Sequence, residues 1–268
     1  MTLGTNLTGD QPRDYNFNTV MFPSQKVNVS DLVGNVNISG GTYTFPRETG
    51  SEGAIGTPAE GATKGQIDYD LSMIDVNTDF IAGYSRYSKK MKNNLPFLES
   101  FLPKALRRDY AKQENADFYA VIAAAATVSA VVTGNKIERL IAEISTLETL
   151  DHEVNAITVT TADWWDIQIT EKSTGAGYGL PGVVTYENGV LRINGIVLVK
   201  ANWIAANKYL VGDWSRINKV TTEGLSLEFS EQDGTNFIDN NITARIEAQV
   251  ALAVEQPDAI ILGDFTAV

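Results

Sequence analysis

The most regular pattern in the chain is an alternation of apolar and polar residues near the C-terminal end. Apolar residues occupy all seven even positions from Ile242 to Val254, and the odd positions are mostly polar. A period of two predicts a β-strand with one buried face. At about 3.3 Å per residue, 14 residues would span roughly 46 Å, which is unusually long for a compact enzyme domain. Leu225, Leu227 and Phe229 predict a partner strand.

Two amphipathic helices are predicted in the middle of the chain. The first extends from Pro103 to about Ala126, with the proline in the first turn, where it is tolerated. Its 24 residues would span roughly 36 Å. Its apolar face comprises Leu102, Leu106, Tyr110, Phe118, Val121 and Ile122. The second helix has apolar residues spaced by three and four between charged ones, namely Ile137, Leu140, Ile141, Ile144 and Leu147.

A long hairpin is predicted before these helices. Residues 41–46 form a short strand, residues 50–65 contain five glycines, and apolar residues at alternating positions from Ile67 to Met73 indicate a returning strand. Its two limbs would reach about 25 Å from the body at about 3.3 Å per residue. A two-stranded hairpin is marginally stable alone in water. We therefore expect this one to lie on a neighbouring molecule.

The remaining segments predict shorter elements. Residues 1–38 are polar and resemble an extended arm that packs on something other than a core of its own. We expect strands at 156–160, 190–193, 196–199 and 209–211, a helix over 162–170 with Thr161 as its N-cap, and a loop at 173–182. The apolar run 119–132 has 14 residues, too few to span a membrane, and predicts a buried helix followed by a turn. The first twenty residues show no secretory signal.

Composition excludes several kinds of chemistry. The chain has 21 Lys and Arg residues against 33 Asp and Glu residues, a net charge of -12, which disfavours general nucleic-acid binding. Without cysteine it has no disulfide, thiolate nucleophile or Cys-based metal site. His152 is the single histidine, so a multi-His metal site is excluded, and we interpret it as a solvated turn residue. No phosphate-loop, dinucleotide, zinc-protease or hydrolase motif occurs. We predict no enzymatic activity and no cofactor.

The charge reverses between Tyr84 and Arg108, where seven residues are basic and only Glu99 is acidic. Two interpretations remain open for this segment. It could contact nucleic acid, or it could be a helix face that pairs with acidic residues of a neighbouring chain. Acidic candidates for the second interpretation are Glu48, Glu52 and Glu60.

Aromatic and acidic residues leave a carbohydrate site open as an alternative. Trp164 and Trp165 could stack on a sugar, although at least one of them is expected in the core. Asp213 precedes Trp214 at the end of a strand pattern, and we interpret it as a turn carboxylate that accepts backbone hydrogen bonds.

The order of several weak motifs resembles one known family. Residues 60–64 resemble the EG-containing segment of the family's extended loop. The helix predicted over 103–126 resembles its spine helix, and residues 155–172 resemble a strand followed by a helix in its axial domain. LRINGIVLV at 191–199 resembles a strand of the family, with isoleucine where proline is usual, and LVGDW at 210–214 resembles the family's vGDf motif. The closing strand at 240–262 ends in Pro257, Asp258 and Ala259. Together these resemble the major capsid proteins of tailed bacteriophages, which have the Hong Kong 97-type capsid fold.

The resemblance implies an α+β fold with five parts. These are an N-terminal arm (1–38), an extended loop (39–82), a peripheral domain with the spine helix (83–151), an axial domain (152–222) and return strands of the peripheral domain (223–268). Contacts between subunits are then expected at Glu60, Gly61, Lys64, Arg86, Lys89, Lys90, Lys92, Arg107 and Arg108.

The resemblance also implies a function and partners. Subunits would form hexamers and pentamers of an icosahedral head that encloses double-stranded DNA, with the DNA on its inner face. Portal, scaffolding and decoration proteins would be further partners, and no membrane would be involved. The protein would reside in the virion after assembly in the host cytoplasm. The arm starts at Met1, so a scaffolding region is expected to be a separate protein or to have been cut off. We assign no cross-link between Lys64 and Asn240 or Asn241.

Two alternatives remain open from the sequence. The first is an encapsulin-like nanocompartment of the same fold that holds protein cargo instead of DNA. The second is the carbohydrate-binding or carbohydrate-cleaving domain that would use Trp164 and Trp165. A monomer in solution would favour the carbohydrate domain over either shell.

Overall fold

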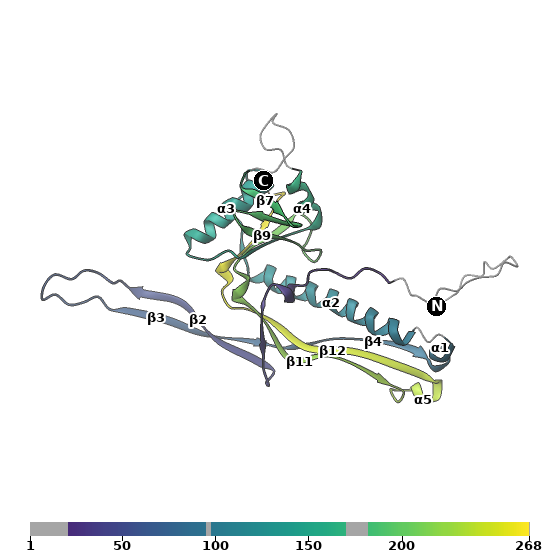
Figure 1. The fold of residues 1–268 in the computed structure, drawn as a ribbon. Helices are drawn as coiled ribbons and strands as arrows, with labels where there is room; N and C mark the ends of the chain where they lie inside the picture. The colour runs from purple at the N-terminus through teal and green to yellow at the C-terminus, as the bar shows by residue number, and fades with distance from the viewer. Residues whose placement is uncertain (1–20, 95–97, 170–181, 268) are drawn as a thin grey trace.

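The computed structural model describes residues 21–94, 98–169 and 182–267. These residues form a four-stranded sheet beside a long helix, a seven-stranded sheet above it, and a two-stranded hairpin that projects to one side (Figure 1). The strands are β1 (Gly34–Asn37), β2 (Thr42–Gly53), β3 (Ile67–Asn77), β4 (Asp79–Ser88), β5 (Thr127–Val128), β6 (Ala156–Val159), β7 (Val184–Glu187), β8 (Val190–Ile193), β9 (Ile196–Lys200), β10 (Lys208–Gly212), β11 (Ile217–Ser230), β12 (Asn241–Val254) and β13 (Ile260–Asp264). The helices are η1 (Val29–Asp31), α1 (Lys89–Asn94), α2 (Leu98–Ala125), α3 (Lys136–Thr149), α4 (Thr161–Gln168), η2 (Trp214–Arg216), α5 (Asn236–Asp239) and η3 (Pro257–Ala259).

The predicted long strand is β12, which lies between β11 and β4 in the four-stranded sheet β1-β11-β12-β4. All of its even positions from Ile242 to Val254 are buried, as the alternation predicted. Two odd positions are buried as well, against expectation. Ala253 is covered by the base of the hairpin, and Thr243 is covered by the turn that contains Asn236. The partner strand β11 starts at Ile217, earlier than the alternating residues indicated.

The spine helix α2 lies on the face of the sheet that carries the even positions of β12. Tyr110, Phe118 and Ile122 are buried in one core with Val250, whereas Val121 is 41% exposed. The helix begins at Leu98 instead of Pro103, so the proline lies inside it. A proline removes one intrahelical hydrogen bond. This close to the N-terminal end, that single loss does not interrupt the helix.

The helix ends at Ala125, although the apolar run predicted buried helix as far as residue 132. The following residues form β5, which pairs in parallel with β13 at Ile261 and Leu262. Val128 and Val132 are 75% and 40% exposed. Pairing with a strand more than 130 residues away in sequence therefore replaces a local helical preference.

The described part of the N-terminal arm packs on its own chain. Val29 and Val33 are buried in the core beneath α2, and the Asn115 side chain accepts a hydrogen bond from the Val29 N–H at 2.9 Å. On the same helix, the buried Glu114 carboxylate forms an ion pair with Lys219 of β11. The surface that receives the arm is therefore α2 and β11 of the same subunit, and residues 1–20 lie outside the described residues.

The seven-stranded sheet has the order β5-β13-β10-β6-β9-β8-β7 and packs against α3 and α4. The apolar stripe of α3 shares a core with Ile157 and Tyr209. For this reason α3 lies with this sheet and not with the peripheral part expected over 83–151. The chain also returns here in β13, which pairs with β10, so 223–268 are not all return strands of the other sheet. Thr160, not Thr161, caps α4 by accepting a hydrogen bond from the Asp163 N–H.

An ion pair fixes the last strand to its neighbour. Lys208 of β10 lies opposite Asp264 of β13, with Lys208 Nζ 2.7 Å from Asp264 Oδ2. Thr266 donates two further hydrogen bonds to the same carboxylate. The hydrogen bond from Lys208 and those from Thr266 hold the pKa of Asp264 well below its usual range.

This depressed pKa predicts a contribution to stability that depends on pH. Because the carboxylate is ionised more readily in the folded than in the unfolded chain, its contribution is fully present above the unfolded pKa of about 3.9 and declines as the pH falls from there through the much lower folded pKa. Asp264→Asn should lower the thermal midpoint most at pH 7, and the difference between the two proteins should shrink steadily between about pH 4 and pH 2. Thermal melts of both proteins across this range test the expectation. Equal destabilisation at both pH values would contradict it.

Candidate assembly surfaces

The hairpin β2–β3 is packed on the body of the subunit at its base and is exposed at its tip. Phe45, Ile74 and neighbouring side chains pack on Val220 and Ala253, on the face of the four-stranded sheet opposite α2. Arg47 donates hydrogen bonds to the carbonyl oxygens of residues 254 and 255 at 2.6 and 2.8 Å. The strands then continue to residues 53 and 67. Strand β2 thus extends beyond residue 46, the predicted end of the first strand, whereas β3 begins at Ile67 as predicted. Figure 1 shows the hairpin extending well beyond the body.

One face of this hairpin exposes large apolar side chains. Tyr69, Leu71 and Met73 are 60%, 68% and 67% exposed, and Ile55 in the tip is 86% exposed. The alternating apolar residues that predicted strand β3 therefore form a face that is not covered by any described residue of the same subunit. Covering a large apolar side chain yields about 1.5–3 kcal/mol. An exposed apolar row on a projecting arm is consequently a surface suited to contact with another molecule.

The hairpin is also acidic. Between Thr42 and Asn77 there are six acidic and two basic residues, a net charge of -4. The predicted contact residues Glu60, Gly61 and Lys64 lie in the tip, and all three are exposed. Gly61 has a φ of +79°, which glycine adopts without strain, and this accounts for a glycine at the turn.

The basic residues of 84–108 do not form one helix face. Arg86 lies in strand β4, Lys89 and Lys90 lie in α1, and Arg107 and Arg108 lie in α2. Arg86 lies in a strand and not in a helix because β4 pairs with β12 as far as Ser88. The side chain of the further candidate, Lys92, lies outside the described residues.

Several of these cations are already paired within the subunit. Arg86 lies 3.4 Å from Asp233, and Lys89 lies 3.0 Å from Glu231. Arg108 contacts Asp109 at 2.7 Å and lies over the ring of Phe22. Since the acids at Asp233 and Glu231 are far away in sequence, the local count of charges overestimated the free positive charge at this end of the sheet.

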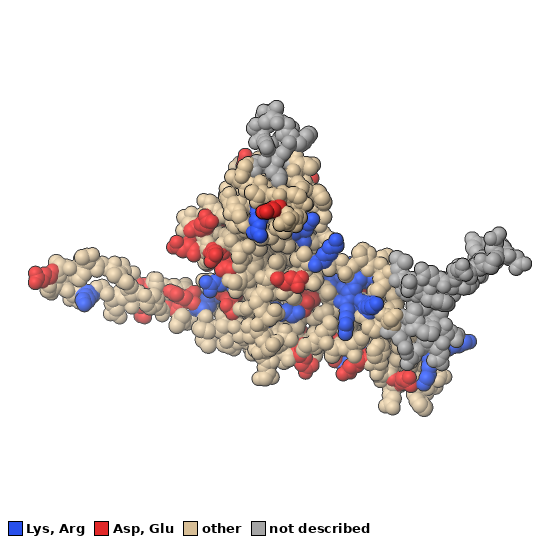
Figure 2. Space-filling model, viewed as in Figure 1, with Lys and Arg blue, Asp and Glu red and all other residues tan. Residues whose placement is uncertain are grey.

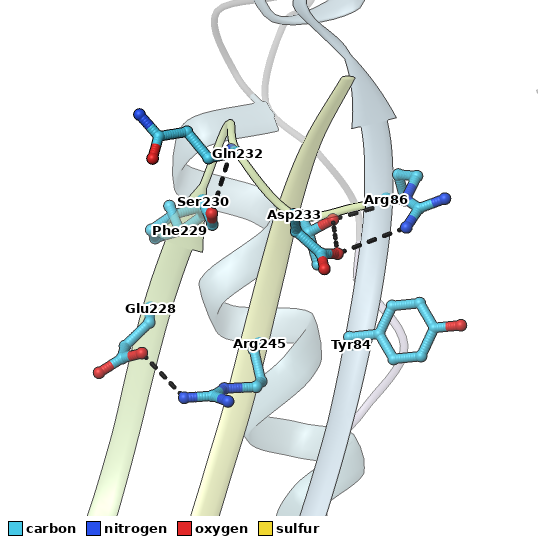
Figure 3. A pocket seen from close by; sticks show the side chains of 9 residues that line it. Tyr84, Arg86, Glu228, Phe229, Ser230, Gln232, Asp233 and Arg245 are labelled. Carbon is cyan, nitrogen blue, oxygen red and sulfur yellow. Dashed lines mark hydrogen bonds and ion pairs between the residues drawn. The ribbon is translucent and has the colours of Figure 1, made fainter. Parts of the chain in front are cut away.

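A groove lies at the outer end of the four-stranded sheet, on the face away from α2 (Figure 3). Its lining residues are Tyr84, Arg86, Glu228, Phe229, Ser230, Gln232, Asp233, Thr243 and Arg245. Arg245 forms ion pairs with Glu228 at 2.9 Å and with Glu247 at 2.7 Å. The Asp233 carboxylate accepts a hydrogen bond from Thr243 Oγ1 at 3.0 Å. Because its charged groups are paired with each other, the groove provides a surface for binding a partner but no unpaired acid or base for catalysis.

Sequence reasoning missed the apolar residues near this groove. In α5, Phe237 and Ile238 are 82% and 80% exposed, and Tyr84 in β4 is 71% exposed. The segment around α5 is too short to show a period, so only the presence of two apolar residues in a polar turn could have marked it. These residues form a second exposed apolar region of the subunit, separate from the one on the hairpin.

The other candidate residues have structural roles. Trp164 is buried, with the Lys200 amine 3.9 Å from its ring centre, so only Trp165 is available to stack on a ligand. Asp213 accepts hydrogen bonds from the Ser215 N–H and from Asn155, as expected of a turn carboxylate. Most of the predicted loop 173–182 lies outside the described residues.

The described residues lack a metal-binding cluster and a membrane-spanning helix. They contain no cluster of three or more His, Cys, Asp or Glu side chains suited to a metal ion. Among them, no helix has both the length and the apolar character needed to cross a membrane.

Comparison with known proteins assigns the family. The phage capsid family matches residues 22–265. The major capsid protein of Enterobacteria phage HK97 is 24% identical over 256 residues, which cover 90% of this chain and 66% of that protein, slightly under two thirds of its length.

Solved structures share the fold at low sequence identity. A chain of Microbacterium phage Oxtober96 has a TM-score of 0.73 at 15% identity and covers 94% of this chain and 96% of its own length. A chain from the capsid of an empty GTA particle has a TM-score of 0.76 at 11% identity, with 96% and 95% covered. These likenesses confirm the expected Hong Kong 97-type α+β fold. Because the family match extends over nearly all of the described residues, the chain belongs to the phage capsid family.

Proposed function

We propose that the chain is a major capsid protein that self-assembles into the icosahedral head shell of a tailed bacteriophage, around double-stranded DNA. One observation carries this proposal beyond family membership. The projecting hairpin exposes Tyr69, Leu71 and Met73, and no described residue of the subunit covers them. If a neighbouring subunit covers their exposed area, the three side chains together yield roughly 3–6 kcal/mol before the costs of association are subtracted.

The proposed contacts between subunits follow from charge and position. The tip residues Glu60, Gly61 and Lys64 reach a neighbour because they lie farthest from the body of their own subunit. Arg86, Lys89 and Lys90 lie at the opposite end of the four-stranded sheet, where the groove and the exposed α5 residues offer a second contact region. Two separate contact regions on one subunit allow it to bind several neighbours, as a closed shell of hexamers and pentamers requires.

The role, location and further partners of the protein follow from the same proposed shell function. As a shell subunit the protein would be structural, with no catalytic role and no cofactor, and it would reside in the virion after assembly in the host cytoplasm. Packaged DNA would lie on the inner face of the shell. Portal, scaffolding and decoration proteins would be its further partners.

Of the alternatives, a nanocompartment of the same fold is the closer one. The relatives found are capsid proteins of phages and of GTA particles, and this favours DNA as the content. The carbohydrate-binding alternative is weaker, because burial of Trp164 leaves Trp165 without an adjacent exposed tryptophan.

Electron microscopy and sedimentation of the purified full chain test the proposal. We expect uniform hollow particles, or pentamers and hexamers that convert to particles. The nucleic acid and protein content of particles isolated from infected cells separates the two kinds of shell. A chain that stays monomeric under all assembly conditions would contradict both shell functions.

A further inference from the structure

The exposed side of α2 carries positive charge that no described residue neutralises. Lys104, Arg107 and Lys112 are exposed and form no ion pair with any described residue. Arg108 lies between them and is paired with Asp109. Figure 2 shows Lys and Arg side chains gathering over this helix.

The spacing of these residues produces a continuous basic strip. Lys104, Arg108 and Lys112 follow at intervals of four, and Arg107 lies beside Arg108, so the four side chains occupy neighbouring positions on one side of the helix. From Lys104 to Lys112 the strip is about 12 Å long. Duplex DNA carries one negative charge per about 1.7 Å of its axis, so the strip faces roughly seven phosphate charges.

The other side of the four-stranded sheet has the opposite character. Its outward positions hold Glu223, Glu228, Asp233 and Glu247 against Arg86 and Arg245. On the surface of α2, the described cations Lys104, Arg107, Arg108 and Lys112 are accompanied by the acidic residues Asp109 and Asp117. Cations are therefore in excess on this part of the helix side and anions on the sheet side. Because the subunit has a net charge of -12, a locally cationic surface of this kind is where a polyanion is repelled least.

We infer that the α2 face bearing Lys104, Arg107 and Lys112 lines the inside of the shell and contacts the phosphates of packaged duplex DNA. This inference rests on the proposed shell function. The competing occupant is the acidic hairpin of a neighbouring subunit. That hairpin presents Tyr69, Leu71 and Met73, which need an apolar partner, whereas α2 exposes no large apolar residue between residues 100 and 120. Duplex DNA, as a polyanion, requires only cations on the surface that it contacts, and α2 provides them.

A charge-reversal variant with a matched control tests the inference. The variant K104E/R107E/K112E reverses cations that have no ion-pair partner among the described residues. The control R86E/K89E/K90E reverses cations of β4 and α1, two of which are paired with Asp233 and Glu231. Each variant changes the charge by six. Binding of a fluorescent 30-base-pair duplex to unassembled full-length subunits is measured by anisotropy between 50 and 200 mM salt. For three phosphate contacts the slope of log K against log salt is about −3 in the parent. We expect at least a tenfold loss of binding at 50 mM salt for the α2 variant, and less than a threefold loss for the control.

Electron microscopy of the same proteins separates this inference from the shell function. We expect the α2 variant to form shells like the parent, with less DNA retained. Equal loss of duplex binding in both variants, or none in the α2 variant, would overturn the inference. A folded α2 variant that forms no shells would also overturn it, because the face would then contact a neighbouring subunit. Failure of the parent itself to form particles would instead refute the proposed function.

Discussion

Val250→Asp is expected to unfold the four-stranded sheet and α2, and to leave little soluble protein. Val250 is 5% exposed and lies in the core with Phe118 and Ile246. An aspartate there would be an unpaired charge among apolar side chains, which costs about 3–5 kcal/mol. The free energy of unfolding of a domain is typically about 5–15 kcal/mol, so this single change removes much or all of that stability.

Gln249→Asp is the matched control, one position away on the same strand. Gln249 lies on the opposite face of β12, half-buried, where its amide donates a hydrogen bond to the Thr78 carbonyl at 3.3 Å. Losing this bond should cost about 1 kcal/mol. Thermal and urea melts of both variants measure the difference. A destructive Gln249→Asp beside a tolerated Val250→Asp would mean that the register of β12 is wrong by one residue.

Removal of the hairpin tip is expected to abolish shells while leaving the subunit folded. Every residue from Ala54 to Gln66 is exposed, so none contributes to a core of its own subunit. Gly53 and Ile67 pair directly across the hairpin, and a two-residue Asn-Gly turn can connect them in place of the tip. The melting temperature should change by less than a few degrees. Electron microscopy should show no closed particles.

A second variant tests whether assembly requires the side chains of the hairpin tip or only the length of the hairpin. It replaces residues 54–66 by a Gly-Ser linker of the same number of residues, which preserves the reach but removes Ile55, Glu60 and Lys64. We expect this variant to assemble as poorly as the deletion. Normal shells from either variant would show that the tip makes no essential contact, and a lost cooperative melt would show that it belongs to the fold of the subunit.

The elements with a strong local period were predictable from the sequence. The alternation from Ile242 to Val254 and the stripe from Ile137 to Leu147 each reflect one buried face, and both are confirmed. The start of α2 was misplaced because Pro103 is typical of a first turn, whereas the helix begins at Leu98 and tolerates the one hydrogen bond that the proline removes near this end. The strand β5 was missed because its only support is pairing with β13.

The candidate surfaces were predictable in part. Glycines and alternation indicated an arm that reaches a neighbour, since neither depends on distant residues. The distribution of free charge was not predictable, because Arg86 and Lys89 are neutralised by residues more than 140 positions away. Likewise, Lys104 and Lys112 became distinct from the other cations only when the structure showed which acids lie near each of them.

The position of the hairpin in an assembled particle tests the central claim most directly. A cryo-electron microscopy reconstruction of particles formed by the full chain would show where Tyr69, Leu71 and Met73 lie. The account predicts that each hairpin crosses onto an adjacent subunit and that these three side chains are buried there. Particles in which the hairpin face stays exposed to solvent, or folds back on its own subunit, would contradict the account.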